Sequence, residues 1–417
     1  MTNSTRPHMK AARQPVLRKA RPLATSASFF DFHRRAGRGD RLTVAFMGGS
    51  LTWGAGASDP QRTSYRALIA RRLEQTYPQA HFSFVDAAIG GSGAQLGSFR
   101  MERDVLAFEP DLLFLDFTLN DGTYQTSPDT LSAYESIVRR AIMLAGCPVV
   151  QMFLASRFDV EKGDTDKMLR RKAHIKISRA YHTGIGDAIV LMQRRYRKKK
   201  GGLNLDALWP PDRFDTTHPG DAGYVCYADA AWEGLQKAVQ QRVVCRPPAE
   251  WVFDDTYNNL NRVPIASLGP LPAGWHAASP KIGSLAFDFL MSRWLDSLWV
   301  GANFIELDRV KTQPTRSAEP LRLNFHGSTV LLFGESTPRT GKYRVVLDGG
   351  AGREFGADKM GRGGGNGHLW DVIAEGLQVG QHSLEIQPIY ESSQVPAELR
   401  LESICVAGGE ARVWRMG

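Results

Sequence analysis

Ser50 stands in a setting that suits a nucleophilic hydroxyl. It follows the apolar run 42–47, and the letters around it read MGGSLTWG over residues 47–54. The two glycines before it let the backbone turn sharply, so that the hydroxyl is presented at the carboxyl edge of a parallel sheet, where open α/β folds bind their ligands. Amide groups at a helix start nearby can bind a developing negative charge. Taken alone, a Gly-Gly-Ser turn also suits a loop without chemistry.

Asp215 and His218 are candidates for the groups that would activate this serine. They lie in the segment DTTHP, residues 215–219, just ahead of an expected helix. A three-residue step on a tight turn can hold a carboxylate against one imidazole nitrogen, which leaves the other nitrogen free to take a proton from a serine. The alternative interpretation is an Asp helix cap beside an incidental histidine.

Asn120 and Gly90 follow two further expected strands, in TLND (118–121) and IGGSG (89–93). The side-chain amide of Asn120 and the backbone N–H of Gly90 can point at one carbonyl oxygen together with the N–H of Ser50. Each such donor typically contributes about 3 kcal/mol of transition-state stabilisation. Gly91 is a second candidate for the glycine. Taken singly, the two segments also suit a turn-forming Asn and a flexible Gly loop.

The elements that must position these residues alternate between strand and helix. Short apolar runs predict strands at 42–47, 82–88, 111–117 and 148–154, with one further short strand marked by Ile189 and Leu191. Helical spacing of apolar residues predicts helices at 65–77, 132–144, 164–180 and 220–239. This alternation is typical of an α/β fold, in which helices cover both faces of a parallel sheet.

The pattern changes beyond about Val244, where CRPPAEW and the proline-rich run 263–280 indicate a linker. Short strands separated by turn residues are then predicted at 285–290, 321–325, 329–333, 343–347, 382–386 and 399–406. They indicate an all-β sandwich or jelly roll. We therefore predict a flexible basic tail over 1–22, a catalytic domain over 23–244 and a β-sandwich accessory domain over 245–417.

Composition and charge argue against a nucleic-acid, metal or membrane partner. The formal charge is +9, and much of the excess lies in the stretches 6–21 and 194–200, which we interpret as solvated surface and not as a nucleic-acid site. The four cysteines show neither CxxC nor metal spacing, so we expect no disulfide framework, no metal and no cofactor. No apolar stretch is long enough to span a membrane. The N-terminus lacks a secretory signal, which predicts a cytoplasmic protein unless a leader has been removed.

The ordered set of Ser, Gly, Asn and Asp-x-x-His resembles the SGNH hydrolase superfamily, which includes the GDSL-like esterases. GGSLTWG, AIGGSG, TLND and DTTHP are similar to its four blocks, and the resemblance covers roughly residues 40–240. It implies a flavodoxin-like α/β/α domain that hydrolyses esters through an acyl-enzyme without a metal. It further implies Ser50 as nucleophile, His218 as general acid/base and Asp215 as its orienting carboxylate, with Gly90 and Asn120 in the oxyanion hole.

The third block departs from the family pattern, because Thr118 stands where a glycine is usual. We expect this residue to narrow the pocket beside Asn120 and to leave the donor in place. Three aromatic residues near the blocks, Trp53, Tyr65 and Tyr124, suit either a sugar or acyl pocket or ordinary core packing.

The attached β-rich half makes the chain similar to bacterial carbohydrate esterases, which implies removal of acetyl groups from a carbohydrate; a small ester is the other substrate class. An SGNH-type sugar O-acetyltransferase is an alternative, because an acyl-enzyme can pass its acetyl group to a sugar hydroxyl as well as to water. A glycan-binding protein with vestigial esterase activity is another. In that case Trp294, Trp299 and Trp370 would stack on sugar rings instead of filling the sandwich core. The natural glycan and the oligomeric state stay open.

Overall fold

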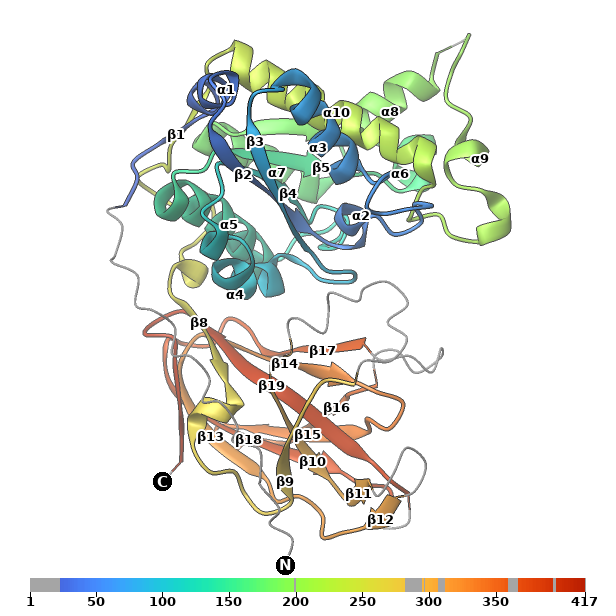
Figure 1. Ribbon diagram of the computed structural model, residues 1–417. Coiled ribbons are helices and arrows are strands. Elements are labelled where there is room, and N and C mark those ends of the chain that lie inside the picture. The colour runs from blue at the N-terminus through green and yellow to red at the C-terminus, as the bar shows by residue number, and fades with distance from the viewer. Residues whose placement is uncertain are drawn as a thin grey trace, which may run out of the picture.

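The computed structural model describes residues 23–198, 200–281, 295, 297–306, 312–358, 367–392 and 395–416. Within these residues the chain forms two parts, which are distinct in Figure 1. We call them the α/β part, from Ala27 to Cys245, and the β part, from Leu260 to Arg415.

A parallel sheet forms the centre of the α/β part. Its order is β3-β2-β4-β5-β6, with bounds β2 Arg41–Gly48, β3 His81–Ala88, β4 Leu112–Asp116, β5 Val149–Phe153 and β6 Gly184–Asp187. The apolar runs predicted the first four of these strands correctly. The prediction at Ile189 and Leu191 was wrong, since both residues lie in helix α8. Strand β6 reads GIGD, which has too few large apolar residues to form a recognisable run.

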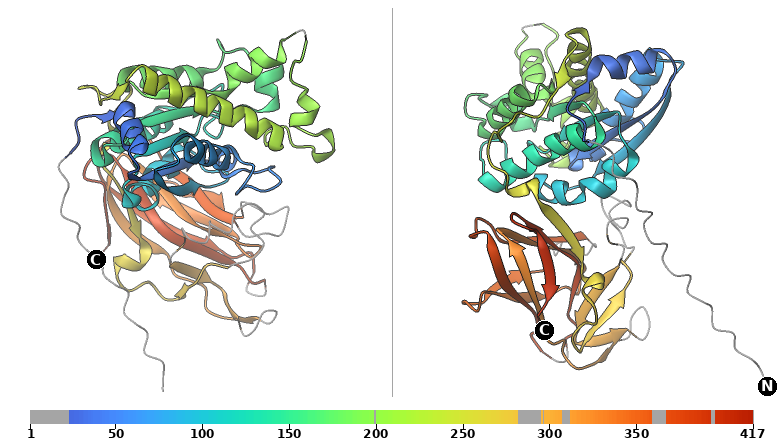
Figure 2. Two further views of the ribbon diagram at one scale, coloured as in Figure 1. Left: turned by 45° about the horizontal axis from the view of Figure 1, so that its top comes forward. Right: turned by 90° about the vertical axis from the view of Figure 1, so that its left-hand side faces the viewer.

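The helices form two layers, one on each side of this sheet (Figure 2). Helix α10 packs against α1, α3 and α8, whereas α5 packs against α4 and α7. The bounds are α1 Phe29–Gly37, α3 Tyr65–Thr76, α4 Ala94–Asp104, α5 Pro128–Ala145, α7 Leu169–Tyr181, α8 Ala188–Tyr196 and α10 Asp221–Gln240. Short helices lie in the connecting loops: α2 Ser50–Trp53, α6 Arg157–Glu161 and α9 Leu205–Leu208. The predicted α/β architecture is confirmed.

The β part consists mainly of two antiparallel sheets that enclose a second apolar core. The first has the order β17-β14-β19-β10-β9, with β8 also paired to β19, and the second has the order β16-β15-β18-β13-β20. The bounds are β8 Leu260–Pro264, β9 Trp275–Ala278, β10 Leu298–Ala302, β13 Leu321–Gly327, β14 Thr329–Ser336, β15 Lys342–Leu347, β16 Arg353–Gly356, β17 Gly367–Ala374, β18 Gly380–Ile389, β19 Glu398–Ala407 and β20 Arg412–Arg415. Smaller ladders join β1 (Ala27–Ser28) to β7 (Val244–Cys245) and β11 (Phe304–Glu306) to β12 (Thr312–Pro314). The strand predicted at 285–290 lies outside the described residues.

The two parts share an apolar contact and polar bonds. Leu331, Phe333 and Cys405 of the β part belong to the same buried cluster as the core of the α/β part. Thr329 Oγ1 donates to Asp129 Oδ1 at 2.8 Å, which connects the start of β14 to the start of α5. Across the described residues, no helix has the length and hydropathy needed to cross a bilayer.

Candidate active site

Strand β2 delivers Ser50 to the carboxyl edge of the sheet. The strand ends at Gly48, Gly49 is the N-cap of α2, and Ser50 is the first residue of that helix. A Cβ built on Gly49 would lie 2.1 Å from Oδ1 of Asn120, so no side chain fits at this position. The glycine therefore allows the amide of Asn120 to pack against the turn that presents Ser50.

Ser50, His218 and Asp215 form a continuous chain of hydrogen bonds. His218 Nε2 lies 2.7 Å from Ser50 Oγ, and His218 Nδ1 lies 2.7 Å from Asp215 Oδ2. Both distances are in the range expected for a nucleophile, its general base and the group that orients the base. The other carboxylate oxygen, Oδ1, accepts the backbone N–H groups of Thr217 and His218 at 2.9 and 3.0 Å.

The environment of Asp215 keeps it ionised. Partial burial acts to raise its pKa, but hydrogen bonds from the backbone and ring of His218 and from the backbone of Thr217 outweigh burial and lower the pKa below its usual value. The carboxylate is therefore negative at neutral pH. In that state it favours the tautomer of His218 with the proton on Nδ1, which leaves Nε2 able to accept the proton of Ser50.

The loop that carries Asp215 and His218 is fixed on several sides. The backbone N–H of Arg157 donates to Thr216 O at 2.8 Å, and the buried Trp209 contacts Thr217 O through its indole nitrogen at 3.4 Å. Beyond the loop, Asp221 at the start of α10 accepts hydrogen bonds from the Ser58 backbone and hydroxyl and from the Thr63 hydroxyl. These contacts join the loop to the segments that follow β5 and α2.

The sheet order β3-β2-β4 brings the other candidate residues to the same edge. Gly90 lies just after β3 and Asn120 just after β4, so their loops flank the loop of Ser50 on either side. Gly91 has φ +70°, a backbone conformation that residues with a side chain rarely adopt. This conformation explains why a glycine stands at position 91.

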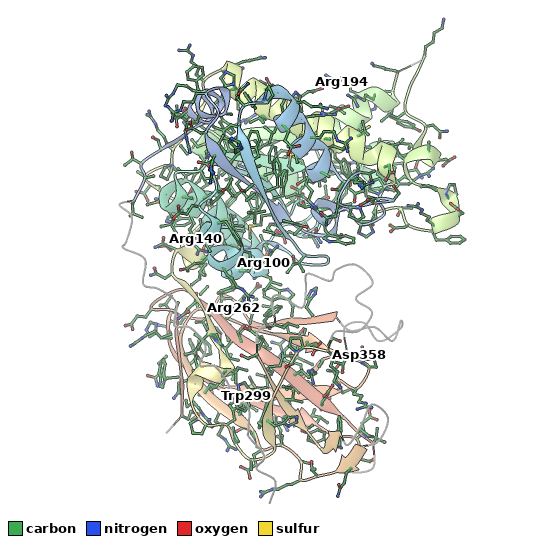
Figure 3. All side chains as sticks on the ribbon, in the orientation of Figure 1. Arg100, Arg140, Arg194, Arg262, Trp299 and Asp358 are labelled. Atoms are coloured by element: carbon green, nitrogen blue, oxygen red, sulfur yellow. The ribbon has the colours of Figure 1, made fainter. Side chains whose placement is uncertain are left out.

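Asp121 and Arg100 hold these loops together. Asp121 Oδ1 accepts the N–H of Ala94 at 3.0 Å, which ties the loop after β4 to the start of α4. Arg100, a fully buried residue of α4, donates to the carbonyl oxygens of Ala87 and Gly48 at the ends of β3 and β2. Figure 3 labels Arg100 close to the boundary with the β part. The sequence alone gave no sign of the role of Arg100.

The side chain of Thr118 points into the protein interior and not, as expected, into the pocket beside Asn120. Its side chain is fully buried, and its hydroxyl lies 3.0 Å from Nδ1 of His174. The ring of His174 is itself buried and stacks on Tyr134 with 3.6 Å between ring centroids. The hydroxyl is therefore taken up by an interior hydrogen bond, and the expectation that Thr118 narrows the pocket beside Asn120 finds no support in this contact.

A buried acid beneath the site makes stability depend on pH. Asp116 ends β4, and burial raises its pKa to about 7. Since an Asp in an unfolded chain titrates near pH ~4, folded Asp116 keeps a proton that the unfolded chain releases, and the contribution of this group to stability falls as the pH rises from about 4 to about 7. Asp116→Asn removes this penalty. In urea unfolding, the stability of the variant relative to wild type should therefore rise by about 2.6 kcal/mol between pH 5 and pH 8. A difference that does not change with pH would contradict the burial of a protonated Asp116.

The three aromatic residues singled out in the sequence have different environments. Tyr65 is fully buried and contacts Thr52 through its hydroxyl, so it belongs to the core. Trp53 is partly buried at the end of α2, whereas Tyr124 is 36% exposed in the loop after β4.

His368 of the β part is a neighbour that sequence reasoning missed. A Cβ built on Gly91 would lie 3.6 Å from its Cε1 atom, so this ring lies against the glycine loop. Burial, with Arg100 as a second cause, lowers the pKa of His368 to about 4, so the ring is neutral at neutral pH. No local signal could have found it, because the two residues are far apart in the sequence.

No metal centre accompanies the described side chains, since none of them form a group of three or more His, Cys, Asp or Glu suited to a metal ion.

The fold and the geometry define a class: an α/β protein with a Ser–His–Asp chain of hydrogen bonds at the carboxyl edge of a parallel sheet. Residues 46–225 match the GDSL-like lipase/acylhydrolase family. This match covers most of the α/β part and confirms its resemblance to the SGNH (GDSL-like) hydrolases.

Relatives of known activity are distant in sequence. An acetylxylan esterase from Geobacillus stearothermophilus is 24% identical over 211 residues, which are 47% of this chain and 94% of that protein. A two-domain esterase active on acetylated mannans, crystallised with mannopentaose, matches 94% of this chain and 98% of its own at a TM-score of 0.73 and 20% identity. A second structure of a two-domain esterase active on acetylated mannans gives a TM-score of 0.69 over the same shares of each chain. These structures show that the two-part fold extends over nearly the whole chain.

Proposed function

We propose that this protein is a serine esterase that removes acetyl groups from a carbohydrate through an acyl-enzyme. The observation that supports the proposal is the hydrogen-bonded chain Ser50–His218–Asp215, in which Ser50 Oγ to His218 Nε2 and His218 Nδ1 to Asp215 Oδ2 are each 2.7 Å. Its position at the carboxyl edge of the sheet is where α/β folds bind their ligands.

The reaction follows from the positions of these atoms. His218 Nε2 takes the proton of Ser50 as Oγ attacks the acetyl carbonyl carbon, and the resulting oxyanion is held by the N–H groups of Ser50 and Gly90 and the amide of Asn120. His218 then gives its proton to the departing sugar oxygen, which leaves an acetyl group on Ser50. A water molecule, deprotonated by His218, attacks this ester, and acetate leaves as Ser50 regains its proton.

Gly90 is the preferred backbone donor over Gly91. The positive φ of Gly91 already explains why a glycine stands there, whereas Gly90 is buried and directly follows Ile89, whose N–H bonds Gly48 O at the end of β2. Gly90 is thus the residue directly after the one that is hydrogen-bonded to the end of β2, the strand that presents Ser50, whereas Gly91 is one residue further on.

The relatives support a sugar ester as substrate, because they include esterases of acetylated xylan and acetylated mannan. They support hydrolysis over acetyl transfer for the same reason. The glycan-binding alternative is weakened, because two of the three tryptophans proposed to stack on sugar are packed against apolar cores. Trp370 packs against the core of the α/β part and Trp299 against the core of the β part. Trp294 lies outside the described residues. Acetate release from acetylated manno- and xylo-oligosaccharides tests the proposal, and acetyl transfer to an added sugar without acetate release would overturn it.

Asn120→Ala is expected to lower kcat by about 10²- to 10³-fold with little change in KM, because the lost donor acts mainly on the oxyanion of the transition state. Steady-state kinetics on p-nitrophenyl acetate measure both constants, and the thermal midpoint of the variant serves as the control for folding. A fall in kcat of less than about threefold would exclude Asn120 from the oxyanion hole.

A further inference from the structure

Two exposed aromatic rings form a pair on loops at the carboxyl edge of the parallel sheet, the edge that also carries Ser50. Phe158 is 53% exposed and Tyr124 is 36% exposed, although large apolar side chains are usually buried. Their ring centroids lie 5.8 Å apart with an angle of 74° between the rings, which is an edge-to-face contact. The pair therefore presents an apolar surface of defined shape to solvent. We call it the Tyr124–Phe158 pair.

The two rings are carried by loops that also hold parts of the site. Tyr124 is in the loop after β4, four residues beyond Asn120, so the two Cα atoms lie within about 14 Å of each other. Phe158 is in α6, the short helix after β5, and follows Arg157, whose N–H bonds the carbonyl of Thr216 in the His218 loop. Since β4 and β5 are neighbours in the sheet, both rings are at its carboxyl edge.

Both rings are carried by fixed backbone. A capping box starts α6, in which Asp159 Oδ2 accepts the N–H of Ser156 at 2.8 Å and Ser156 Oγ accepts the N–H of Asp159. On the other side, the carbonyl of Thr123 accepts the N–H of Arg170 at 3.1 Å, which holds the backbone next to Tyr124. The rings are thus organised before any ligand arrives, which reduces the entropy lost on binding.

From this placement we propose that the Tyr124–Phe158 pair is the surface on which a sugar ring of the substrate packs while its acetyl group reaches Ser50. The proposal rests on the proposed function and names what would make the site prefer a sugar ester over a simple ester. Pyranose rings carry apolar C–H faces, and aromatic side chains are the residues that offer a large, rigid apolar surface with little entropy to lose. Apolar patches beside a site are also typical of ligand-binding grooves.

The test compares a sugar ester with an ester that has no sugar. The variants are Tyr124→Ala, Phe158→Ala and the double variant, and the readout is kcat/KM for an acetylated manno-oligosaccharide divided by kcat/KM for p-nitrophenyl acetate. The double variant is expected to lower this ratio about tenfold, mainly by raising KM for the oligosaccharide. Tyr124→Phe keeps the ring and should keep the ratio.

Phe108→Ala is the matched control. Phe108 is also 53% exposed but precedes β4, at the opposite edge of the sheet, so its removal should leave the ratio unchanged. An unchanged ratio in the single variants and the double variant, or an equal fall for both esters, would overturn the proposal. Failure of the proposed function gives a different result. Wild type would then release no acetate from either ester, or would release it at the same rate as Ser50→Ala.

Discussion

Ser50→Ala is expected to lower kcat for acetate release by about 10⁴-fold or more, because removal of a nucleophile leaves only the catalysis supplied by binding and the oxyanion donors. Ser50 is buried and its hydroxyl already contacts His218 Nε2, so the substitution removes the reacting atom with little disturbance of packing. Release of p-nitrophenol and of acetate, measured on purified enzyme, gives the two rates.

Ser92→Ala is the control for this prediction, because Ser92 also stands among glycines just after a strand. Its hydroxyl donates to the carbonyl of Ile89 at 2.8 Å, so it lacks a general base in the described contacts. The loss of activity in Ser92→Ala should be far smaller than in Ser50→Ala. If Ser50→Ala keeps wild-type activity, the assignment of the nucleophile is wrong.

Asp215→Asn is expected to lower kcat by about 10⁴-fold while the protein stays folded. The backbone N–H groups of Thr217 and His218 can still donate to the remaining oxygen, which preserves the turn. The new amide would donate to Nδ1 of His218 and shift its proton to Nε2, and this tautomer cannot accept the proton of Ser50. Steady-state kinetics and circular dichroism together separate lost chemistry from lost structure.

Asp212→Asn provides the comparison, since Asp212 is an exposed carboxylate in the same connection. It should keep activity close to wild type. Equal losses in both variants would mean that the loop responds to any change of charge, and the specific role of Asp215 would then be refuted.

Much of the site was predictable because chemistry-bearing residues fall at the ends of apolar runs. Parallel strands end at one edge of their sheet, so Ser50, Gly90 and Asn120 were expected to be near one another before their distances were known. The strict order of the four segments along the chain added the resemblance to SGNH enzymes. The turn between Asp215 and His218 is local, and a three-residue step is enough to predict contact of their side chains.

The unpredicted features depend on contacts between distant segments. Strand β6 has two glycines and no apolar run, and its pairing with β5 decides its structure. The contact of His368 with the loop of Gly91 requires the docking of the β part, which no local pattern encodes. The position of Thr118 in a motif does not show the partner of its hydroxyl, because the buried hydrogen bond with His174 depends on how α7 packs on the sheet.

The central claim is that Ser50 carries the acyl group. Reaction with diethyl p-nitrophenyl phosphate, followed by mass spectrometry of the digested protein, tests it most directly, because this reagent leaves one diethylphosphoryl group on an activated serine. We predict that esterase activity is lost in proportion to the appearance of a single label on the peptide that contains Ser50. In Ser50→Ala this peptide should carry no label, and in Asp215→Asn it should be labelled much more slowly than in wild type. Complete inactivation with the label on another residue would contradict the claim.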